Sequence, residues 1–299
     1  MNREVAQKNS ILSWILLIIL SLIWGSSFIL MKKGLMNFTA GQVAGIRIVS
    51  GSVILLPIAL KNFSRLKRSQ VLPVIGSGLL GSLIPAFLFA MAQTKINSSI
   101  SGVLNALTPL FTLLVGASVF MMKFSIRMLA GVLIGFIGSV ILITTGSGGN
   151  FWAVNSYGLL IVLATVLYGF NINIINSRLR DMKSADIIGF SLMFVGPAAL
   201  LYLVFDAGIP EILQKEPEAL YSFSAVIMLG IFGTAVAYML FNKMIKITNP
   251  VFSSSVTYLV PIVAVMWGIL DGEKLQGMHY LGVLVIILGV FIANTSRKS

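Results

Sequence analysis

The second half of the sequence repeats part of the first half at a fixed spacing of 152 residues, and this repeat restricts the possible folds more than any other feature. Nine residues between positions 230 and 268 are identical to the residue 152 positions earlier, without a gap. They are Gly230, Gly233, Leu240, Phe241, Asn249, Ser253, Leu259, Pro261 and Gly268, which match Gly78, Gly81, Leu88, Phe89, Asn97, Ser101, Leu107, Pro109 and Gly116. A shift of one residue then aligns 282–284 with 131–133. We conclude that the chain consists of two homologous halves.

Ten apolar stretches of the chain are long enough to cross a membrane as helices. Hydrophobic residues make up 57% of the chain and charged residues only 10%, against roughly 45–50% and about 25% in an ordinary soluble domain. A helix of about 20 residues crosses the hydrocarbon layer, and none of the stretches alternates like the strands of a barrel. The stretches lie at 11–31, 40–60, 70–91, 98–121, 126–144, 156–176, 184–206, 221–241, 252–270 and 278–294. The sequence therefore predicts an all-α integral membrane protein.

Each half contains five of these stretches, and this odd number predicts that the halves enter the membrane from opposite faces. Many secondary transporters are built from such inverted repeats, with a substrate site near the midplane between them. We therefore expect ten transmembrane helices as two inverted five-helix repeats, at residues 11–144 and 156–294. A linker at 145–155 joins them, and short tails at 1–10 and 295–299 flank them.

The net charge of +12 is distributed unevenly between the two predicted sides of the membrane. With the N-terminus inside, the internal segments hold 15 of the 21 lysines and arginines, the external segments hold 5, and Arg47 lies within a span. The positive-inside rule then places both termini in the cytoplasm and the linker at 145–155 outside. Because topology accounts for the basic residues, we expect no nucleic-acid partner.

Residues that metal, redox or hydrolytic chemistry would need are scarce. The chain has no cysteine and a single histidine, His279, so it can form neither a thiolate site nor a histidine cluster. It has no P-loop, HExxH motif or nucleophile elbow. No Asp or Glu lies in the interior of a predicted span, since Asp186 and Asp206 are near helix ends, which argues against proton coupling through an acid embedded in the membrane. We expect neither a cofactor nor enzymatic activity.

Several short motifs resemble those of a known family. Residues 23–28 read IWGSSF, 45–48 read GIRI, and 259–262 read LVPI and are followed by Gly-Glu at 272–273. Together with the duplicated ten-span layout, they resemble the signatures of EamA-type transporters of the drug/metabolite transporter superfamily. The resemblance implies a carrier of the bacterial inner membrane that exports small metabolites such as amino acids or their derivatives. The chain departs from the family pattern at Lys123, where an acidic residue is expected.

Two aromatic residues lie at mirrored depths in the predicted repeats. Trp24 precedes Gly25 about seven residues from the external end of its stretch, roughly 10 Å deep at 1.5 Å per residue. Tyr168 precedes Gly169 at the equivalent place, 144 residues later and near the cytoplasmic face. The aromatic pair could form two gates or two stacking walls. Alternatively, the glycines let neighbouring helices approach and the rings are packing.

Arg47 is the only unambiguous charge inside a predicted span. A charge there costs at least about 2.5–3.5 kcal/mol unless it finds partners, so it is a candidate functional residue. Its partners could be the hydroxyls of Ser26 and Ser27, backbone carbonyls or a substrate carboxylate. The second half has Ser191 at the equivalent place, so an anion site would be asymmetric. The alternative is that Arg47 snorkels to the surface and anchors its helix.

Polar residues form stripes on two of the stretches. The fourth stretch carries Ser101, Asn105, Thr108 and Thr112. Their spacing of 4, 3 and 4 confines them to about 60° of a helix, and Pro109 beside them frees a backbone carbonyl. The eighth stretch carries Thr234, Tyr238 and Asn242 at a spacing of four. Such stripes either line water or bond to a neighbouring helix, and the mid-stripe asparagine favours lining.

These features predict a secondary transporter that exports a small organic metabolite by alternating access. A lining rich in aromatic, hydroxyl and carboxamide groups, with one arginine and no acid, favours an amino acid or a similar zwitterionic or weakly anionic compound. A channel, or a multidrug efflux protein without a proton-coupling carboxylate, is the alternative. The expected partners are the substrate and the lipid bilayer, with the chain as a monomer or homodimer. The candidate substrate-binding residues are Trp24, Ser27, Arg47, Gln93, Ser101, Asn105, Thr108, Tyr168, Asn173, Tyr238, Asn242 and Thr257.

Overall fold

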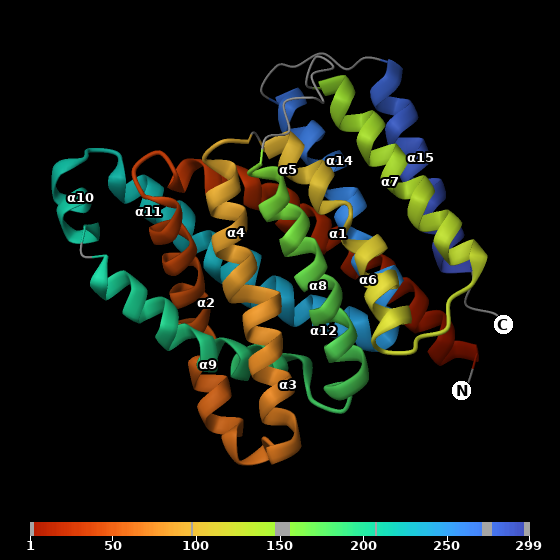
Figure 1. Ribbon diagram of the computed structural model, residues 1–299, viewed down its shortest axis with the longest axis horizontal. Coiled ribbons are helices and arrows are strands. Elements are labelled where there is room, and N and C mark those ends of the chain that lie inside the picture. The colour runs from red at the N-terminus through yellow and green to blue at the C-terminus, as the bar shows by residue number, and fades with distance from the viewer. Residues whose placement is uncertain (1–2, 97, 147–155, 207, 271–276, 296–299) are drawn as a thin grey trace.

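The computed structural model describes residues 3–96, 98–146, 156–206, 208–270 and 277–295, and every regular element in this part of the chain is helical (Figure 1). The first half contains α1 (Arg3–Gly34), α2 (Ala40–Asn62), η1 (Phe63–Arg65), α3 (Arg68–Gly78), η2 (Leu79–Leu83), α4 (Ile84–Gln93), α5 (Ser98–Asn105), α6 (Thr108–Ser118) and α7 (Ile126–Gly146). The second half contains α8 (Gly158–Arg178), α9 (Ser184–Phe205), α10 (Ile209–Lys215), α11 (Ala219–Met228), η4 (Leu229–Val236), α12 (Ala237–Ile247), α13 (Pro250–Ser254), α14 (Val256–Leu270) and α15 (Gly277–Thr295). The predicted linker beyond Gly146 and the Gly-Glu motif at 272–273 lie outside the described residues.

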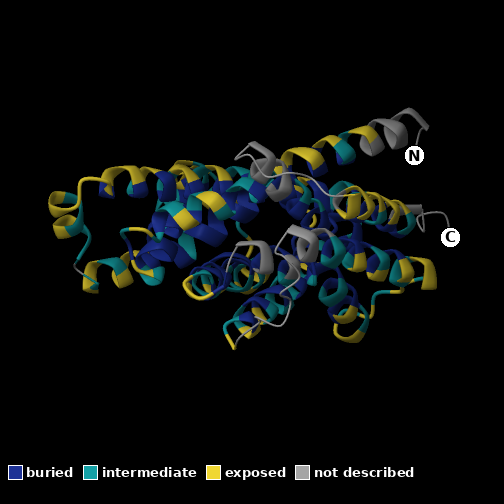
Figure 2. Cartoon of the chain, turned by 90° about the horizontal axis from the view of Figure 1, so that it is seen from above, coloured by how far each residue is buried: buried dark blue, intermediate teal, exposed yellow. Residues whose placement is uncertain are grey.

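Six helical segments in the described part of the chain are long and apolar enough to cross a membrane. They are Ile11–Gly34, Ala40–Arg65, Arg68–Gln93, Gly158–Arg178, Ser184–Phe205 and Ala219–Ile247. Four shorter apolar helices, Thr108–Ser118, Ile126–Ile141, Pro250–Val263 and Tyr280–Ala293, overlap the remaining predicted stretches. The all-α membrane class is therefore confirmed. Large hydrophobic side chains are exposed on the outer faces, as lipid contact requires, while buried residues lie between the helices (Figure 2).

The third and eighth predicted spans each contain a π-helical segment at a matching place. In the first half α3 continues through η2 into α4, and in the second half α11 continues through η4 into α12. Leu79 and Leu83, the ends of η2, correspond at the repeat spacing of 152 to positions within η4. A π-helical turn is rare and is frequently found at functional sites. Its occurrence in both halves indicates that the repeat extends to backbone geometry.

The fourth and ninth predicted spans are each divided into two helices. The first break falls at Ala106 and Leu107, just before Thr108 and Pro109 open α6. Proline lacks the backbone N–H, and its ring clashes with the carbonyl four residues earlier. Here that carbonyl belongs to Asn105, the last residue of α5, which explains a break at this place. The predicted polar stripe from Ser101 to Thr112 is therefore not continuous, because α5 and α6 carry its two ends separately.

Helices α2 and α9 pack antiparallel, so that equivalent residues exchange partners. The Gln42 side chain, at the beginning of α2, donates to Asp206 Oδ1 at the end of α9 over 3.3 Å. Asn62, at the end of α2, donates to Asp186 Oδ1 at the beginning of α9 over 2.8 Å. At a spacing of 144, Gln42 corresponds to Asp186 and Asn62 to Asp206. Gln42 thus contacts Asp206, and the repeat counterparts of these two residues contact each other. Such an exchange of partners is a local two-fold symmetry.

Helices α7 and α15 form a second exchanged pair at one end of the molecule (Figure 1). A Cβ added at Gly131 would lie 2.7 Å from the carbonyl oxygen of Gly289, and one added at Gly138 would lie 3.1 Å from that of Gly282. At a spacing of 151, Gly131 corresponds to Gly282 and Gly138 to Gly289. Small residues at these positions let the two backbones touch, which is how helices associate where no hydrophobic effect drives them together.

We predict that Gly131→Ala lowers the free energy of unfolding by about 1–3 kcal/mol, because its methyl group would press on backbone atoms that cannot rotate away. Thermal unfolding of the purified protein measures this change. Gly277→Ala is the matched control, since a Cβ at Gly277 meets nothing within 4 Å. Equal melting temperatures for the two variants would show that the α7 and α15 backbones do not touch.

Candidate functional site

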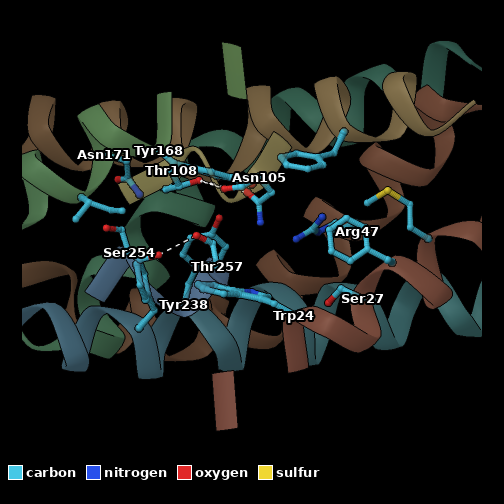
Figure 3. Close-up of a pocket in the computed structure, with 15 residues that line it drawn as sticks. Trp24, Ser27, Arg47, Asn105, Thr108, Tyr168, Asn171, Tyr238, Ser254 and Thr257 are labelled. Carbon is cyan, nitrogen blue, oxygen red and sulfur yellow. Dashed lines mark hydrogen bonds between the residues drawn. The ribbon is translucent and has the colours of Figure 1, made fainter. Parts of the chain in front are cut away.

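A cavity of about 70 Å³ lies between the two halves (Figure 3). On a scale where about 10–15 Å³ holds one water, it has room for several water-sized groups, and a larger molecule needs it to widen. Both halves contribute to its lining, which consists of Trp24, Ser27, Phe28, Met31, Arg47, Phe89, Asn105, Thr108, Tyr168, Asn171, Ile172, Tyr238, Phe241, Ser254 and Thr257.

Most of the lining consists of residues that correspond to each other in the two repeats. Positions 144 residues apart pair in α1 and α8, and positions 152 residues apart pair in the later helices. The pairs are Trp24 with Tyr168, Ser27 with Asn171, Phe28 with Ile172, Phe89 with Phe241, and Asn105 with Thr257. Equivalent positions of the two halves therefore meet at one cavity.

The two π-helical segments join the halves at this cavity. Trp24 Nε1 donates to the carbonyl oxygen of Gly233 in η4 over 3.0 Å. Tyr238 Oη donates to the carbonyl oxygen of Gly81 in η2 over 2.5 Å. Gly81 and Gly233 are equivalent in the repeat, so each π segment accepts a hydrogen bond from an aromatic side chain of the opposite half.

Aromatic rings form two opposed groups on the cavity wall. Trp24 makes edge contacts with Phe241 and Tyr238, at centroid distances of 5.0 and 5.6 Å. Phe89 and Tyr168 stack at 6.1 Å with an interplanar angle of 24°. Trp24 and Tyr168 thus belong to one cavity, which fits the prediction of two stacking walls better than that of two separate gates.

The glycines after these aromatic residues do allow close approach, as the alternative interpretation required. A Cβ at Gly25 would lie 2.6 Å from Val263 Cβ, and one at Gly169 would lie 2.9 Å from the Phe111 carbonyl. Helix packing by the glycines and cavity lining by the aromatic residues therefore occur together.

Arg47 is buried, with 9% of its surface exposed, and its side chain enters the cavity (Figure 3). Its Nε donates to Thr234 Oγ1 in η4 over 2.8 Å. The described part of the chain places no carboxylate within 4.0 Å of it. The guanidinium points toward Asn105 within the cavity (Figure 3). This geometry disagrees with the snorkelling alternative and leaves the terminal nitrogens facing the cavity.

Eight of the predicted site residues line the cavity, and four lie elsewhere. Asn173 is buried and donates to the carbonyls of Thr112 and Gly169, which ties α8 to α6. Asn242 is buried beside Ser184, whose carbonyl accepts from it over 3.4 Å. The other two are Gln93 and Ser101, which are absent from the lining. Any contact of these four with substrate stays a prediction that this cavity does not support.

Sequence reasoning missed several lining residues. Asn171 lies two residues before the predicted Asn173, and about 200° around a helix separates such neighbours, so only one of them can face the cavity. The repeat could have identified Asn171, because this residue is the counterpart of the predicted site residue Ser27. Ser254 lies three residues before the predicted Thr257 in the ninth stretch, and Phe89 and Phe241 are one of the identical pairs.

The chemistry of the lining suits binding of a small polar molecule with an apolar part. No group of three or more His, Cys, Asp or Glu residues that could hold a metal ion occurs in the described residues. The cavity offers one cation, two carboxamides, several hydroxyls and aromatic faces. Such a site can orient a small ligand through a few polar contacts.

The same pattern of two halves appears in comparison with known proteins. The EamA-like transporter family matches residues 12–144 and 155–295, one match on each half. The uncharacterized inner membrane transporter YedA of Escherichia coli K12 is 28% identical over 284 residues, which cover 93% of this chain and 89% of the relative. A probable amino-acid metabolite efflux pump of the same strain is 22% identical over 295 residues, covering 96% and 95%.

More distant matches also extend over most of the chain. The S-adenosylmethionine/S-adenosylhomocysteine transporter of Chlamydia muridarum is 22% identical over 276 residues, covering 89% of this chain and 86% of that protein. A solved crystal structure has the same fold, with a TM-score of 0.72 and 17% identity over 96% of this chain and 99% of its own length. With both halves matched, the chain belongs to the EamA-like transporter family of membrane proteins.

Proposed function

We propose that this protein is a secondary transporter that exports a small zwitterionic or weakly anionic metabolite with an apolar part. The observation that carries the proposal is the buried guanidinium of Arg47, which faces a cavity between two homologous halves and has no acidic partner among the described residues. A buried charge of this kind is costly unless a ligand or solvent compensates it. The carboxylate of a substrate would supply the missing countercharge.

The proposed architecture has ten transmembrane helices in two inverted five-helix repeats. The antiparallel, partner-exchanging contacts of α2 with α9 and of α7 with α15 support it. The beginning of α1 and the end of α15 lie at the same end of the molecule, as an even number of crossings requires (Figure 1). The positive-inside rule assigns that end to the cytoplasmic side of the membrane, which we propose is a bacterial inner membrane.

The proposed mechanism is alternating access by rocking of the two halves around the cavity. Names of two relatives support the substrate class, since one is called a probable amino-acid metabolite efflux pump and another an S-adenosylmethionine/S-adenosylhomocysteine transporter. The buried acid of the described chain, Asp186, accepts a hydrogen bond from Asn62 and does not line the cavity. Proton coupling through a cavity carboxylate is therefore not part of the proposal.

Flux through proteoliposomes tests the function itself. A carrier saturates with substrate concentration and exchanges labelled for unlabelled substrate across the membrane, whereas a channel does neither. We expect saturable counter-exchange of at least one zwitterionic or monoanionic compound from a metabolite library. A linear flux without exchange would favour the channel alternative.

We predict that Arg47→Lys and Arg47→Gln each lower the transport rate about tenfold or more, because each loses a charge-assisted hydrogen bond to the substrate. A lysine has one nitrogen and cannot donate to Thr234 while also presenting a planar fork to a carboxylate. Initial rates in proteoliposomes, normalised to the amount of protein, measure the effect. Membrane expression of both variants should stay near that of the wild type.

Lys61→Gln is the control for the Arg47 variants, because Lys61 is exposed at the end of α2 and lies outside the cavity. It should leave the rate unchanged. Wild-type transport by Arg47→Lys, with an unchanged apparent affinity, would mean that the arginine only anchors its helix.

The topology proposal is tested with single cysteines, which are easy to place in a chain that has none. A membrane-impermeant thiol reagent applied to intact cells should label Gly148→Cys and leave Arg65→Cys unlabelled. The reason is the excess of basic residues on the side that contains Arg65. The opposite labelling pattern would reverse the topology and with it the direction in which the cavity opens.

A further inference from the structure

The repeat symmetry of the cavity is broken at Arg47, which carries its positive charge, and at Tyr238. Arg47 corresponds to Ser191, but the Ser191 hydroxyl donates to the carbonyl of Val74 over 3.1 Å and does not line the cavity. Tyr238, likewise, corresponds to Ala86. A cavity with two equivalent ends would accept an asymmetric ligand in either direction. Because only one end carries a cation, a ligand with one anionic group has one preferred orientation.

Asn171 lies at the opposite end of the cavity from Arg47, with Asn105 and Thr257 between them (Figure 3). Its side chain is 2% exposed, and its Oδ1 has no hydrogen-bond partner among the described residues. A Cβ at Gly81 would lie 2.6 Å from its Cγ, so the bare backbone of η2 makes room for this carboxamide. A buried polar group without a partner costs about 1–3 kcal/mol, which a ligand can recover by bonding to it.

The groups around Asn171 favour a neutral partner for its carboxamide. The neighbouring Ser254 and Thr257 hydroxyls already donate to carbonyls of their own chain segment, each over 2.9 Å. Among the described residues no carboxylate lines the cavity, while Arg47 contributes one positive charge. A zwitterion would bring an ammonium group without an acidic partner into this site, and an unpaired buried charge is expensive. A monoanion with a neutral amide would instead bring the formal charge of the occupied cavity to zero.

We propose that the preferred substrates are monocarboxylates with a secondary amide, such as N-acylated amino acids, and that Asn171 is the residue that selects for the amide. The substrate carboxylate binds Arg47, and the amide pairs with the Asn171 carboxamide, which can both donate and accept. The apolar part lies between the aromatic walls. This inference rests on the proposed transport function and chooses the weakly anionic class over free amino acids.

The test compares three compounds that share a phenyl ring and a carboxylate. N-Acetylphenylalanine adds a secondary amide, phenylalanine adds an ammonium group, and 3-phenylpropanoate adds neither. Their dissociation constants are measured by isothermal titration calorimetry with the full chain in lipid nanodiscs. We expect N-acetylphenylalanine to bind about tenfold or more tightly than either of the other two, as expected for a recovered buried hydrogen bond.

Two substitutions at Asn171 should change this order in opposite ways. Asn171→Leu keeps the size but loses both polar atoms, so its affinity for N-acetylphenylalanine should fall to its affinity for 3-phenylpropanoate. The affinity for 3-phenylpropanoate should stay within about twofold of the wild-type value. Asn171→Asp adds a carboxylate, so phenylalanine should become the tightest ligand of the three. Ser177→Ala, at an exposed position of the same helix, should keep the wild-type order.

Several results would overturn the inference: equal affinities of the wild type for all three compounds, an equal loss for all three in Asn171→Leu, or no binding of any of them. Should Asn171→Leu not fold, the reversed order in Asn171→Asp decides. Saturable counter-exchange of a different metabolite would refute this substrate assignment and leave the proposed transport function standing. A protein that exchanges no compound of the library would refute the transport function itself.

Discussion

Hydrogen bonds from aromatic side chains to the carbonyls of Gly81 and Gly233 join the two halves at the centre of the molecule. A membrane interior offers no water to bond with exposed backbone groups, so helices meet there through internal partners and close packing. Both glycines lie in π-helical segments, and both abut a polar side chain of the opposite half, Asn171 or Ser27. The position of the cavity depends on these contacts, because Trp24 and Tyr238, which make the bonds, also line it.

Duplication explains why a buried cavity exists, and divergence explains how it acquires a direction. Corresponding helices of the two halves meet at the cavity, so its lining consists largely of residue pairs that are related by the repeat. The backbone carbonyls of Arg47 and Ser191 still occupy equivalent places, against Gly230 and Gly78. Only the side chains differ: one reaches into the cavity and one bonds to Val74. This pair of unlike residues thus places a positive charge at one end of the cavity and not at the other.

The sequence was sufficient to predict the membrane class, the duplication and much of the site, because each of these depends on local patterns. Trp24, Arg47 and Asn105 stood out as polar or amphipathic groups within apolar runs, and they do line the cavity. The choice between Asn171 and Asn173 depends on how α8 is rotated against its neighbours, which one helix alone does not determine. The break before Thr108 likewise separates a stripe that an unbroken helix would have kept together.

In the proposed mechanism, the bonds that join the halves must break when the cavity changes the side to which it opens. Each is an ordinary hydrogen bond, with a net contribution of about 0.5–1.5 kcal/mol, whereas the seam of α7 and α15 is a tight contact between backbones along two helices. The weaker link therefore lies at the cavity and the stronger one at the periphery. A substrate that contacts Trp24 and Tyr238 touches the very side chains that hold the halves together. In the proposed mechanism, these two residues would couple occupancy of the cavity to movement of the halves.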